Sequence, residues 1–574
     1  MIKLQTFKLW SRKQRWIGPY GLLALGLIVI ACTLRITLLS QQWPASNSDE
    51  ATMGLMALHM ARGTDFPVFF YGQSYMGSLE AALAAPLFNI FGASLVTLRL
   101  GMVLLFGLFL VVLYLLASLL YSRKLGLLSL ALLIFGSSEM FTRQLKAVGG
   151  AMETCLFGAL ALLLAIRLAL TFVPDLSGVD RRRLLLYACL GGVFGLGIWS
   201  HMLVLPFVFL ACVMLFLCCR PELGRYVWRG LIPGLLVGLL PLLIYNVQHP
   251  DHNSIVTLWQ LHSVGGVGSS KTFGLLNFPW RMDLLGTISV SIPMTMGANP
   301  LCPMSTAPGA WYDNLQFSCI AFQASWGLGY ILLLLLTCIL AIRLLKHGHW
   351  LLPFRSESEL SVRRMQVLAL GRVILLASAV LTLLAYVSSP GPALVPITSE
   401  RYLVGMLVAT PAVLAPLSSA FGLLRRSIAK PLAWAAVLLS GAVIATVLSV
   451  LVMGTVTVFR QGPDVQADLN KHNALINYLI SQKISYFYSD YWHCNRLIFQ
   501  SDEKVVCAVL NNDLTPGQDR YPLYPVLVKR APQVAYVFSS SSDQAKNFAH
   551  WAAQKGLHYR SSTFLEFSIF QPTS

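Results

Sequence analysis

Two adjacent carboxylates, Asp49 and Glu50, come directly after the first long apolar stretch of the chain. Residues 51–62 have helical periodicity, and Asn47 stands three residues before Glu50, so the pair also fits the start of a helix. Acidic side chains are favoured near the positive end of a helix, which offers a purely structural explanation. An exposed aspartate is nevertheless ionised at neutral pH, and an attacking hydroxyl needs a base that takes its proton. The pair is therefore a candidate for general-base chemistry.

Several basic side chains flank apolar stretches and could bind a phosphate. They are Arg143, Lys146, His201 and Arg401, the last followed directly by Tyr402. A departing phosphate gathers negative charge, which fixed cations stabilise. Each of these residues also has a structural explanation, because lipid phosphates, snorkelling or carbonyl capping can occupy it. Charges near membrane depth are costly and tend to be functional, so the set is a hypothesis for a phosphate site.

The composition places these residues in a membrane protein. The chain has 574 residues, of which 56% are hydrophobic and 11% are charged. Soluble domains carry about 25% charged residues. Apolar runs such as 104–120 and 331–340 fit helices that cross a hydrocarbon core, and the alternating pattern of a membrane barrel is absent. We expect an all-α polytopic membrane protein.

The net charge of +18 reflects membrane topology rather than nucleic-acid binding. Basic residues gather in alternate short loops, for example at 123–124, 181–183 and 425–430, which is the positive-inside pattern. This pattern predicts a multi-pass protein of the cell (inner or plasma) membrane, with a cytoplasmic N-terminus and an extracytoplasmic C-terminus. Nucleic acid is excluded as a partner, and membrane lipids are expected.

Apolar runs and loop charges together predict about eleven spans in a membrane domain of residues 1–460. Two long outer loops, 41–94 and 248–326, separate some of them. The apolar stretch 79–92 is expected to lie at the interface as a short helix. The predicted spans are 18–40, 95–120, 125–142, 152–171, 184–199, 203–219, 230–247, 327–345, 366–387, 402–424 and 431–457.

Residues 461–574 have the composition of a soluble domain, and we expect a small extracytoplasmic α/β domain there. The patterns at 484–488, 505–509 and 534–538 predict strands, and those at 464–481 and 543–555 predict helices. Of eleven cysteines, four fall in two pairs in the outer segments. In an oxidising compartment these pairs suggest disulfides, with four free thiols as the alternative. The pairs are Cys302 with Cys319 and Cys494 with Cys507.

The first outer loop resembles a known family. Its acidic pair is followed by an aromatic and glycine segment, Phe69–Gly77, then an apolar helix ending in Phe91-Gly92, and then Leu98-Arg99-Leu100. This layout is similar to that of the GT-C membrane glycosyltransferases, and most of all to glycosyltransferase family 39 and its bacterial relatives. The resemblance covers about residues 15–455 in layout, and its motifs lie mainly in 43–100.

The resemblance implies inverting transfer of a sugar from a polyprenyl-phosphate donor to an acceptor hydroxyl on the outer face. Asp49 would act as general base, and Glu50 would orient the acceptor or a metal. The acceptor, whether lipid, glycan or protein, stays open. No cluster has zinc spacing, so we predict no metal site or certain cofactor, although the family leaves a divalent metal possible. The residues expected to line the substrate site are Tyr71, Gln73, Tyr75, Glu80 and Glu153, the last where family 39 often has an aspartate.

Other functions fit parts of the pattern. A flippase-type transporter would show internal repeats and helices broken at mid-membrane, whereas this chain concentrates its polar residues in two outer loops. A polymerase or ligase of polysaccharides or lipid-linked glycans would need outer arginines and histidines but no acidic pair. The segment Asp490-Tyr491-Trp492 suits either sugar stacking or a small domain's core, and the pattern favours core.

Overall fold

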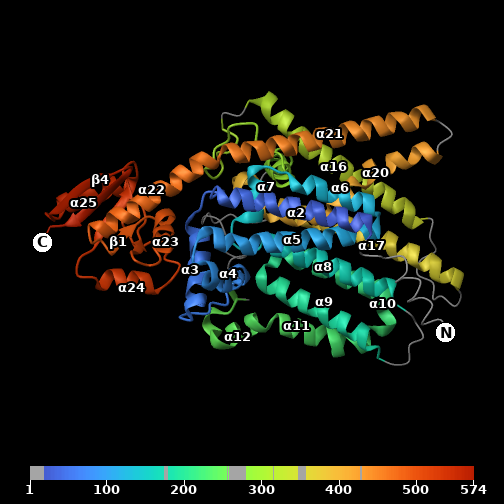
Figure 1. Cartoon of the computed structure of the whole chain (residues 1–574), viewed down its shortest axis with the longest axis horizontal. Helices are drawn as coiled ribbons and strands as arrows, with labels where there is room; N and C mark the ends of the chain where they lie inside the picture. Colours follow the sequence, from blue (N-terminus) through green and yellow to red (C-terminus); the bar gives the residue numbers. More distant parts are fainter. Residues whose placement is uncertain are drawn as a thin grey trace.

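The computed structural model describes residues 18–172, 179–254, 256–257, 280–313, 316–346, 357–426 and 430–573. A bundle of long helices forms one part of the molecule, and a small α/β domain lies at one end of it (Figure 1). Part of the predicted outer loop 248–326 lies outside the described residues. The fold is therefore the expected all-α membrane bundle with an appended α/β domain.

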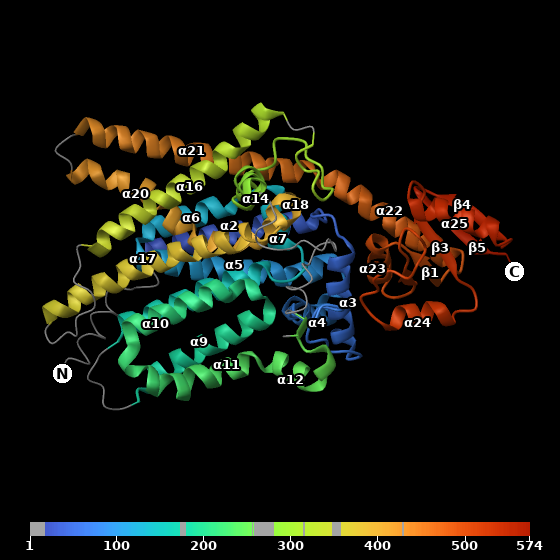
Figure 2. The same cartoon turned by 180° about the vertical axis from the view of Figure 1, so that it is seen from behind.

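The bundle consists almost entirely of helices joined by short turns (Figures 1 and 2). In chain order they are α2 (Pro19–Ser40), α3 (Ser48–Arg62), α4 (Leu79–Phe91), α5 (Leu95–Leu120), α6 (Arg123–Ile134), α7 (Ser138–Leu145), α8 (Ala151–Leu170), α9 (Arg181–Ser200), η1 (Met202–Val204), α10 (Leu205–Tyr226), η2 (Val227–Leu231), α11 (Ile232–Gly238), α12 (Leu240–Gln248), η3 (Pro250–His252), α14 (Trp280–Gly286), η4 (Thr287–Ser291), α15 (Ile292–Thr295), α16 (Phe317–Lys346), α17 (Glu357–Val387), α18 (Gly391–Leu394), α19 (Pro396–Ser399), η5 (Glu400–Ala409), α20 (Thr410–Arg426) and α21 (Lys430–Arg460).

Among the described residues, nine helical runs are long and apolar enough to cross a membrane. The number rises to ten if α6 and α7, which meet at 97°, count as one span. This differs from the predicted number of about eleven. The bend after Ile134 breaks the span predicted at 125–142, and Ser137 caps the start of α7 by accepting a hydrogen bond from the amide of Met140.

One of the nine runs, Met202–Gly238, contains parts of two predicted spans, 203–219 and 230–247. Gly230 lies against Leu184, and Gly238 lies against Gly192, so α11 runs parallel to α9. Because α10 begins where α9 ends, the run must reverse direction near η2, as Figure 2 shows. Because the helix continues without a break through this reversal, Met202–Gly238 is one of the nine runs, although it contains parts of two predicted spans.

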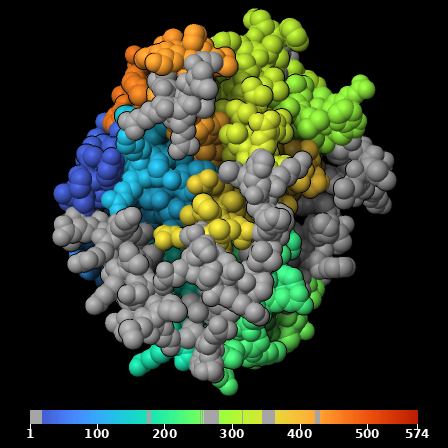
Figure 3. All heavy atoms as spheres, turned by 90° about the vertical axis from the view of Figure 1, so that its right-hand side faces the viewer, coloured from blue at the N-terminus to red at the C-terminus, as the bar shows by residue number. Residues whose placement is uncertain are grey.

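The candidate site residues lie at one end of the bundle, and clusters of basic residues lie at the other. The helices α3, α4 and α7 lie at the end next to the α/β domain (Figures 1 and 2). The basic positions 123–124 and 181–183 begin α6 and α9, whose other ends approach the first group. Figure 3 views the end opposite the α/β domain, where α5, α10 and α17 finish or begin. Such segregation of charge agrees with the positive-inside expectation.

The α/β domain follows α21 through a further helix, α22 (Gly462–Ser481), which continues the same helical run. Its sheet has the order β2-β1-β3-β5-β4, with the first three strands parallel and the last two antiparallel. The three predicted strands and both predicted helices are confirmed, whereas the hairpin of β4 and β5 was not predicted. The elements are β1 (Tyr486–Ser489), α23 (Tyr491–Gln500), β2 (Val506–Val509), α24 (Leu523–Arg530), β3 (Ala535–Ser539), α25 (Asp543–Gln554), β4 (Tyr559–Phe564) and β5 (Phe567–Pro572).

The structure joins both of the suspected cysteine pairs. Cys302 and Cys319 have Cα atoms 5.9 Å apart, and Cys494 and Cys507 have Cα atoms 5.4 Å apart. Disulfides persist in oxidising compartments, so both bridges agree with an extracytoplasmic position for these segments.

Candidate active site

Asp49 lies at the first turn of α3, where it meets the α/β domain. Its Oδ1 accepts a hydrogen bond from the hydroxyl of Tyr491 and another from Arg520 at 3.1 Å. Arg520 also donates to the Tyr491 hydroxyl at 2.8 Å. No described residue donates to the second oxygen, Oδ2, and the side chain is 29% exposed. The carboxylate is thus oriented through one oxygen while the other stays available to a substrate.

Glu50, the other half of the acidic pair, has a different environment. It forms a fully buried, two-pronged ion pair with Arg99, with oxygen to nitrogen distances of 2.6 and 2.7 Å. Burial alone would raise the pKa of Glu50, but Arg99 outweighs it and the net shift is downward. Asn47 accepts a hydrogen bond from the Glu50 amide, as expected, but the Glu50 side chain turns to Arg99 instead of completing a capping box. Arg99 also donates to the carbonyl of Pro44 at 2.8 Å.

The α/β domain packs on α3 through α23. Asn495 donates to Thr52 at 3.1 Å across this interface. The ring of Phe499 lies over Gly54, where a Cβ atom would come within 2.7 Å of it, and it stacks on Phe88 of α4. A glycine at position 54 is therefore required by the close approach of the two domains.

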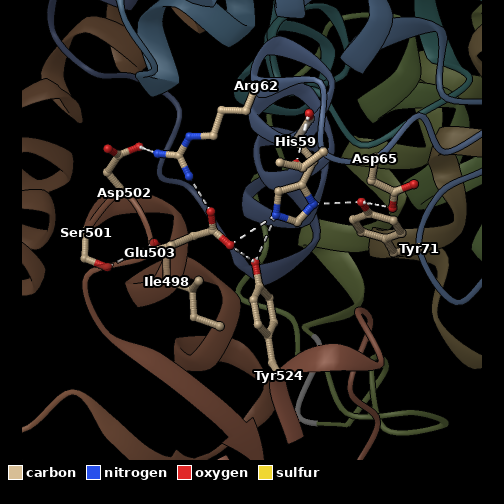
Figure 4. A network of polar contacts seen from close by, with 10 residues as sticks. His59, Arg62, Asp65, Tyr71, Ile498, Ser501, Asp502, Glu503 and Tyr524 are labelled. Atoms are coloured by element: carbon tan, nitrogen blue, oxygen red, sulfur yellow. Dashed lines mark hydrogen bonds and ion pairs between the residues drawn. The ribbon is translucent and has the colours of Figure 1, made fainter. Parts of the chain in front are cut away.

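A polar network ties the two domains together beside this contact (Figure 4). Its centre is His59, whose Nδ1 lies 2.8 Å from the Tyr71 hydroxyl and whose Nε2 lies 3.1 Å from Glu503. The Tyr71 hydroxyl donates to Asp65 at 2.7 Å, so it accepts from His59. Tyr524 also donates to Glu503, at 3.0 Å. Both ring nitrogens thus lie within hydrogen-bonding distance of an oxygen atom, so His59 links the first outer loop to the α/β domain.

Lys146 directly follows α7 and lies close enough to Glu50 for the two charges to interact. Burial lowers its pKa to about 8, with the charge of Glu50 opposing this shift and that of Arg99 adding to it. Its ammonium has no hydrogen bond or ion pair with any described residue. A half-buried cation of this kind is suited to an anionic ligand.

Arg401, another of the predicted basic residues, lies near Tyr75 of the first outer loop. Burial raises the pKa of Tyr75, Tyr402 adds to the shift, and Arg520, Arg401 and then Asp49 also act on it. Arg401 is exposed and stacks over Tyr402 at 5.1 Å. The structure thus brings Arg401 and Tyr402, from η5, to the loop that carries the acidic pair.

Arg143 is not a free cation. It is paired with Glu400 at 2.7 Å and lies 3.7 Å from Glu139. Glu400 is buried and precedes Arg401, so this ion pair fixes the start of η5 next to α7. Glu400 and Glu139 largely neutralise the charge of Arg143.

We predicted His201 as one of the cations of the phosphate site, but its surroundings in the structure favour the neutral ring. It forms the turn between α9 and η1, where its Nδ1 accepts a hydrogen bond from the amide of Leu203 at 3.2 Å. Burial, with the nearby charge of Arg401, lowers the pKa of His201 to about 4. The ring lies against Gly150, which has φ of 89°. At neutral pH it offers an uncharged Nε2–H donor to a ligand.

Glu80 and Glu153 form a buried carboxyl pair between α4 and α8. Burial and the charge of Glu153 raise the pKa of Glu80 well above its ordinary value. The amide of Gly149 donates to Glu80 Oε2 at 2.9 Å. No described residue otherwise satisfies Glu80 Oε1 or Glu153 Oε2, so one proton shared by the pair accounts for both.

Tyr71 and Gln73, which we expected to line the substrate site, are held by contacts with the protein. Tyr71 is buried in the network of Figure 4, where it contacts His59 and Asp65. Gln73 lies in the turn that follows, with its amide donating to the Phe70 carbonyl at 2.9 Å. Within the described ranges, no group of three or more His, Cys, Asp or Glu could hold a metal ion.

Sequence reasoning missed the contribution of the α/β domain to the site. Tyr491 and Arg520 complete the surroundings of Asp49, yet the sequence favoured a core role for the first and gave none to the second. The signal available was their position among polar residues beside aromatic ones. Nothing in a single sequence tells which distant segment such residues contact.

The long helical bundle, the loops at one end and the appended α/β domain together make a fold that is found among solved structures. Among solved structures, the chain is similar to ArnT from Cupriavidus metallidurans bound to undecaprenyl phosphate, with a TM-score of 0.55, 12% identity, and coverage of 97% of this chain and 99% of that one. It is also similar to the apo state of the same protein, with a TM-score of 0.52, 12% identity, and coverage of 95% and 97%. No family model matches the chain, and no curated protein matches it in sequence. The likeness establishes the fold.

The buried Glu50–Arg99 pair yields a stability prediction. Glu50→Gln leaves the Arg99 charge buried and unpaired, which costs about 3–5 kcal/mol. The apparent melting temperature of the purified full chain should therefore fall strongly. The control is Glu566→Gln, which breaks the exposed pair with Lys471 and should cost no more than about 1 kcal/mol. Equal losses in the two variants would contradict the assignment.

The network around Glu503 yields a pH-dependent prediction. The hydrogen bond from His59 lowers the pKa of Glu503, and burial opposes the shift. Its stabilisation of domain docking is therefore present above the ordinary glutamate pKa of about 4.3 and disappears as the pH falls below it. Glu503→Gln should speed hydrogen exchange in α23 at pH 7, and its difference from the wild type should vanish at low pH.

The matched control for that experiment is Asp502→Asn. It removes only the pair between Asp502 and Arg62, in which both side chains are substantially exposed. Exchange in α23 should change little. If Glu503→Gln and Asp502→Asn behaved alike at pH 7, the network would not hold the domains together.

Proposed function

We propose that the chain is an inverting glycosyltransferase that moves a sugar from a polyprenyl-phosphate donor to an acceptor hydroxyl on the non-cytoplasmic side of the membrane. The observation that carries the proposal is Asp49, oriented through Oδ1 by Tyr491 and Arg520 and with no hydrogen bond to Oδ2 from the part of the chain that the structure describes. The GT-C fold, and the undecaprenyl phosphate bound to the similar ArnT structure, support the choice of donor.

In this reaction Asp49 Oδ2 accepts the proton of the acceptor hydroxyl as its oxygen bonds to the anomeric carbon. The bond from that carbon to the phosphate oxygen breaks, and the electron pair leaves with the polyprenyl phosphate. Attack and departure on opposite faces invert the anomeric centre. Tyr491 and Arg520 hold Asp49 in position, because both donate to its other oxygen.

Lys146 and Arg401 would stabilise the charge that develops on the leaving phosphate, and the Nε2–H of His201 and the Tyr402 hydroxyl would add hydrogen bonds. Arg143 acts through Glu400, by fixing η5. Glu50 likewise acts through Arg99, which anchors the segment that carries Asp49. We therefore assign Glu50 and Arg143 as positioning residues.

The orientation follows from charge. The basic starts of α6 and α9 lie at the end of the bundle away from Asp49, and such clusters favour the cytoplasmic side. One disulfide lies in the predicted outer loop 248–326, and the other lies in the α/β domain that holds Asp49. Both agree with an oxidising compartment on that side of the membrane. The site then faces the compartment where polyprenyl-linked sugars would be presented.

Asp49→Asn tests the proposal. Removing the base should lower the transfer rate about 10²–10⁴-fold, because the amide cannot take the proton. In cells that lack the gene, one polyprenyl-phosphate sugar should accumulate, and the wild-type chain but not Asp49→Asn should clear it. Asp464→Asn, at an exposed position of α22, is the control. Clearance by an equally abundant Asp49→Asn variant would overturn the proposal.

Lys146 predicts the alkaline side of the pH profile. Its ammonium is lost as the pH rises through its pKa of about 8, so kcat/KM of the free enzyme should fall above that pH. Lys146→Met should raise the donor KM about 10- to 100-fold and lack this alkaline fall. An unchanged fall in the variant would show that another group titrates.

A further inference from the structure

The α/β domain contains a hollow of about 650 Å³. One of its walls is formed by Tyr491, the residue whose hydroxyl donates to Asp49. Sites for small molecules commonly have volumes of about 300–1,000 Å³. The hollow is open to solvent, and most of its lining is polar. Among its lining residues are Asp490, Tyr491, Trp492, Asn512, Gln518 and Gln544.

The topology places this hollow where open α/β sheets bind ligands. It lies at the carboxyl ends of the three parallel strands: Asp490 follows β1, Leu510 follows β2, and Gln544 lies in the helix after β3. In the order β2-β1-β3, the chain leaves β1 toward one neighbour and later returns on its other side. Such a switch in strand order leaves a crevice outside the carboxyl ends of the strands.

Gln544 offers the hollow an amide that can pair with a ligand. The residue as a whole is only 8% exposed, and it lines the hollow. Its amide forms no hydrogen bond with any residue that the structure describes, and its atoms reach solvent at the wall of the hollow. The amide is therefore held in place and free to pair with a ligand that has hydroxyl groups.

Trp492 supplies a flat apolar surface at the rim. Its side chain is 58% exposed, although it is the largest type of side chain and lies next to the hollow. It meets Tyr491 edge to face, with the ring centroids 5.1 Å apart. An exposed indole beside amide side chains gives a stacking face for the apolar side of a sugar ring, and the amides can pair with its hydroxyls.

The charges select the kind of ligand. Asp490 and Asp513 line the hollow, and none of its described lining residues is basic. Asp490 accepts hydrogen bonds from the amide of Trp492 at 2.9 Å and from His493 at 2.7 Å, which keeps its charge in place. A phosphate or an acidic sugar would be repelled, whereas a neutral or amino sugar would not.

Tyr491 connects the hollow to the proposed chemistry, since it lines the hollow and its hydroxyl donates to Asp49. We propose that the hollow is the acceptor subsite and that the acceptor is a saccharide without acidic groups, stacked on Trp492 and bonded to Gln544. This inference rests on the proposed function. A ring bound there would present a hydroxyl toward the free oxygen of Asp49.

The test measures binding without a donor or turnover. Saturation-transfer NMR on the purified full chain would use three trisaccharides: neutral maltotriose, a cationic glucosamine trimer and acidic trigalacturonate. A neutral or cationic trimer should bind and the acidic one should not. Trp492→Ala and Gln544→Leu should each weaken binding on the order of tenfold, and Trp492→Phe should restore part of it.

Two controls separate binding from folding. Trp551→Ala removes an indole from α25, away from the hollow, and should leave binding unchanged. Gln544→Leu removes an amide that makes no hydrogen bond with any described residue, so the fold should keep its stability. The inference fails if neither non-acidic trimer binds, if the acidic trimer binds best, or if Trp492→Ala matches Trp551→Ala.

The outcome is separable from that of the proposed function. Asp49→Asn should bind the saccharide as the wild type does. If the saccharide binds but the wild-type chain transfers no sugar, the hollow stands and the proposed reaction falls. If transfer is found but the hollow variants bind and react as the wild type does, the reaction stands and this subsite falls.

Discussion

The buried ion pair between Glu50 and Arg99 is the constraint on which the site depends. A charge at zero exposure is tolerated only when it is paired and its remaining hydrogen-bonding capacity is used. Arg99 meets this condition by also bonding the carbonyls of Gln42 and Pro44, so the end of α2, the start of α3 and the start of α5 are tied at one point. The position of Asp49 follows directly, because it is the neighbour of the anchored residue.

Four carboxylates close to one another then acquire different roles from their surroundings. Glu50 is paired with Arg99, whereas Glu80 is buried beside Glu153, and burial together with the charge of Glu153 raises the pKa of Glu80. Asp49 meets donors on one oxygen and solvent on the other. General-base chemistry needs a carboxylate that is oriented and that a substrate can still reach, and among these four only Asp49 combines the two properties.

The sequence predicted the elements better than their contacts. Long apolar runs located the long helices, and short apolar runs at 505–509 and 534–538 located strands, because buried elements are apolar along their buried length. The β4–β5 hairpin escaped notice, since β4 is poorly buried and its turn has Leu565 at positive φ in place of glycine or asparagine. The partners of Asp49 lie 442 and 471 residues away, so no local pattern could find them. The neutral state of His201 likewise depends on burial and on Arg401, which belong to the folded chain alone.

The division of the site between two bodies has a mechanistic reason. Inversion requires the acceptor oxygen and the departing phosphate on opposite faces of the anomeric carbon, so groups that serve them should come from different directions. Here the oriented base is held by the α/β domain, through Tyr491 and Arg520, while Lys146 and Arg401 belong to the helical bundle. The sugar would react between them. Under the proposed function, docking of the domain through His59 and Phe499 is part of catalysis, because undocking removes both donors to Asp49 at once.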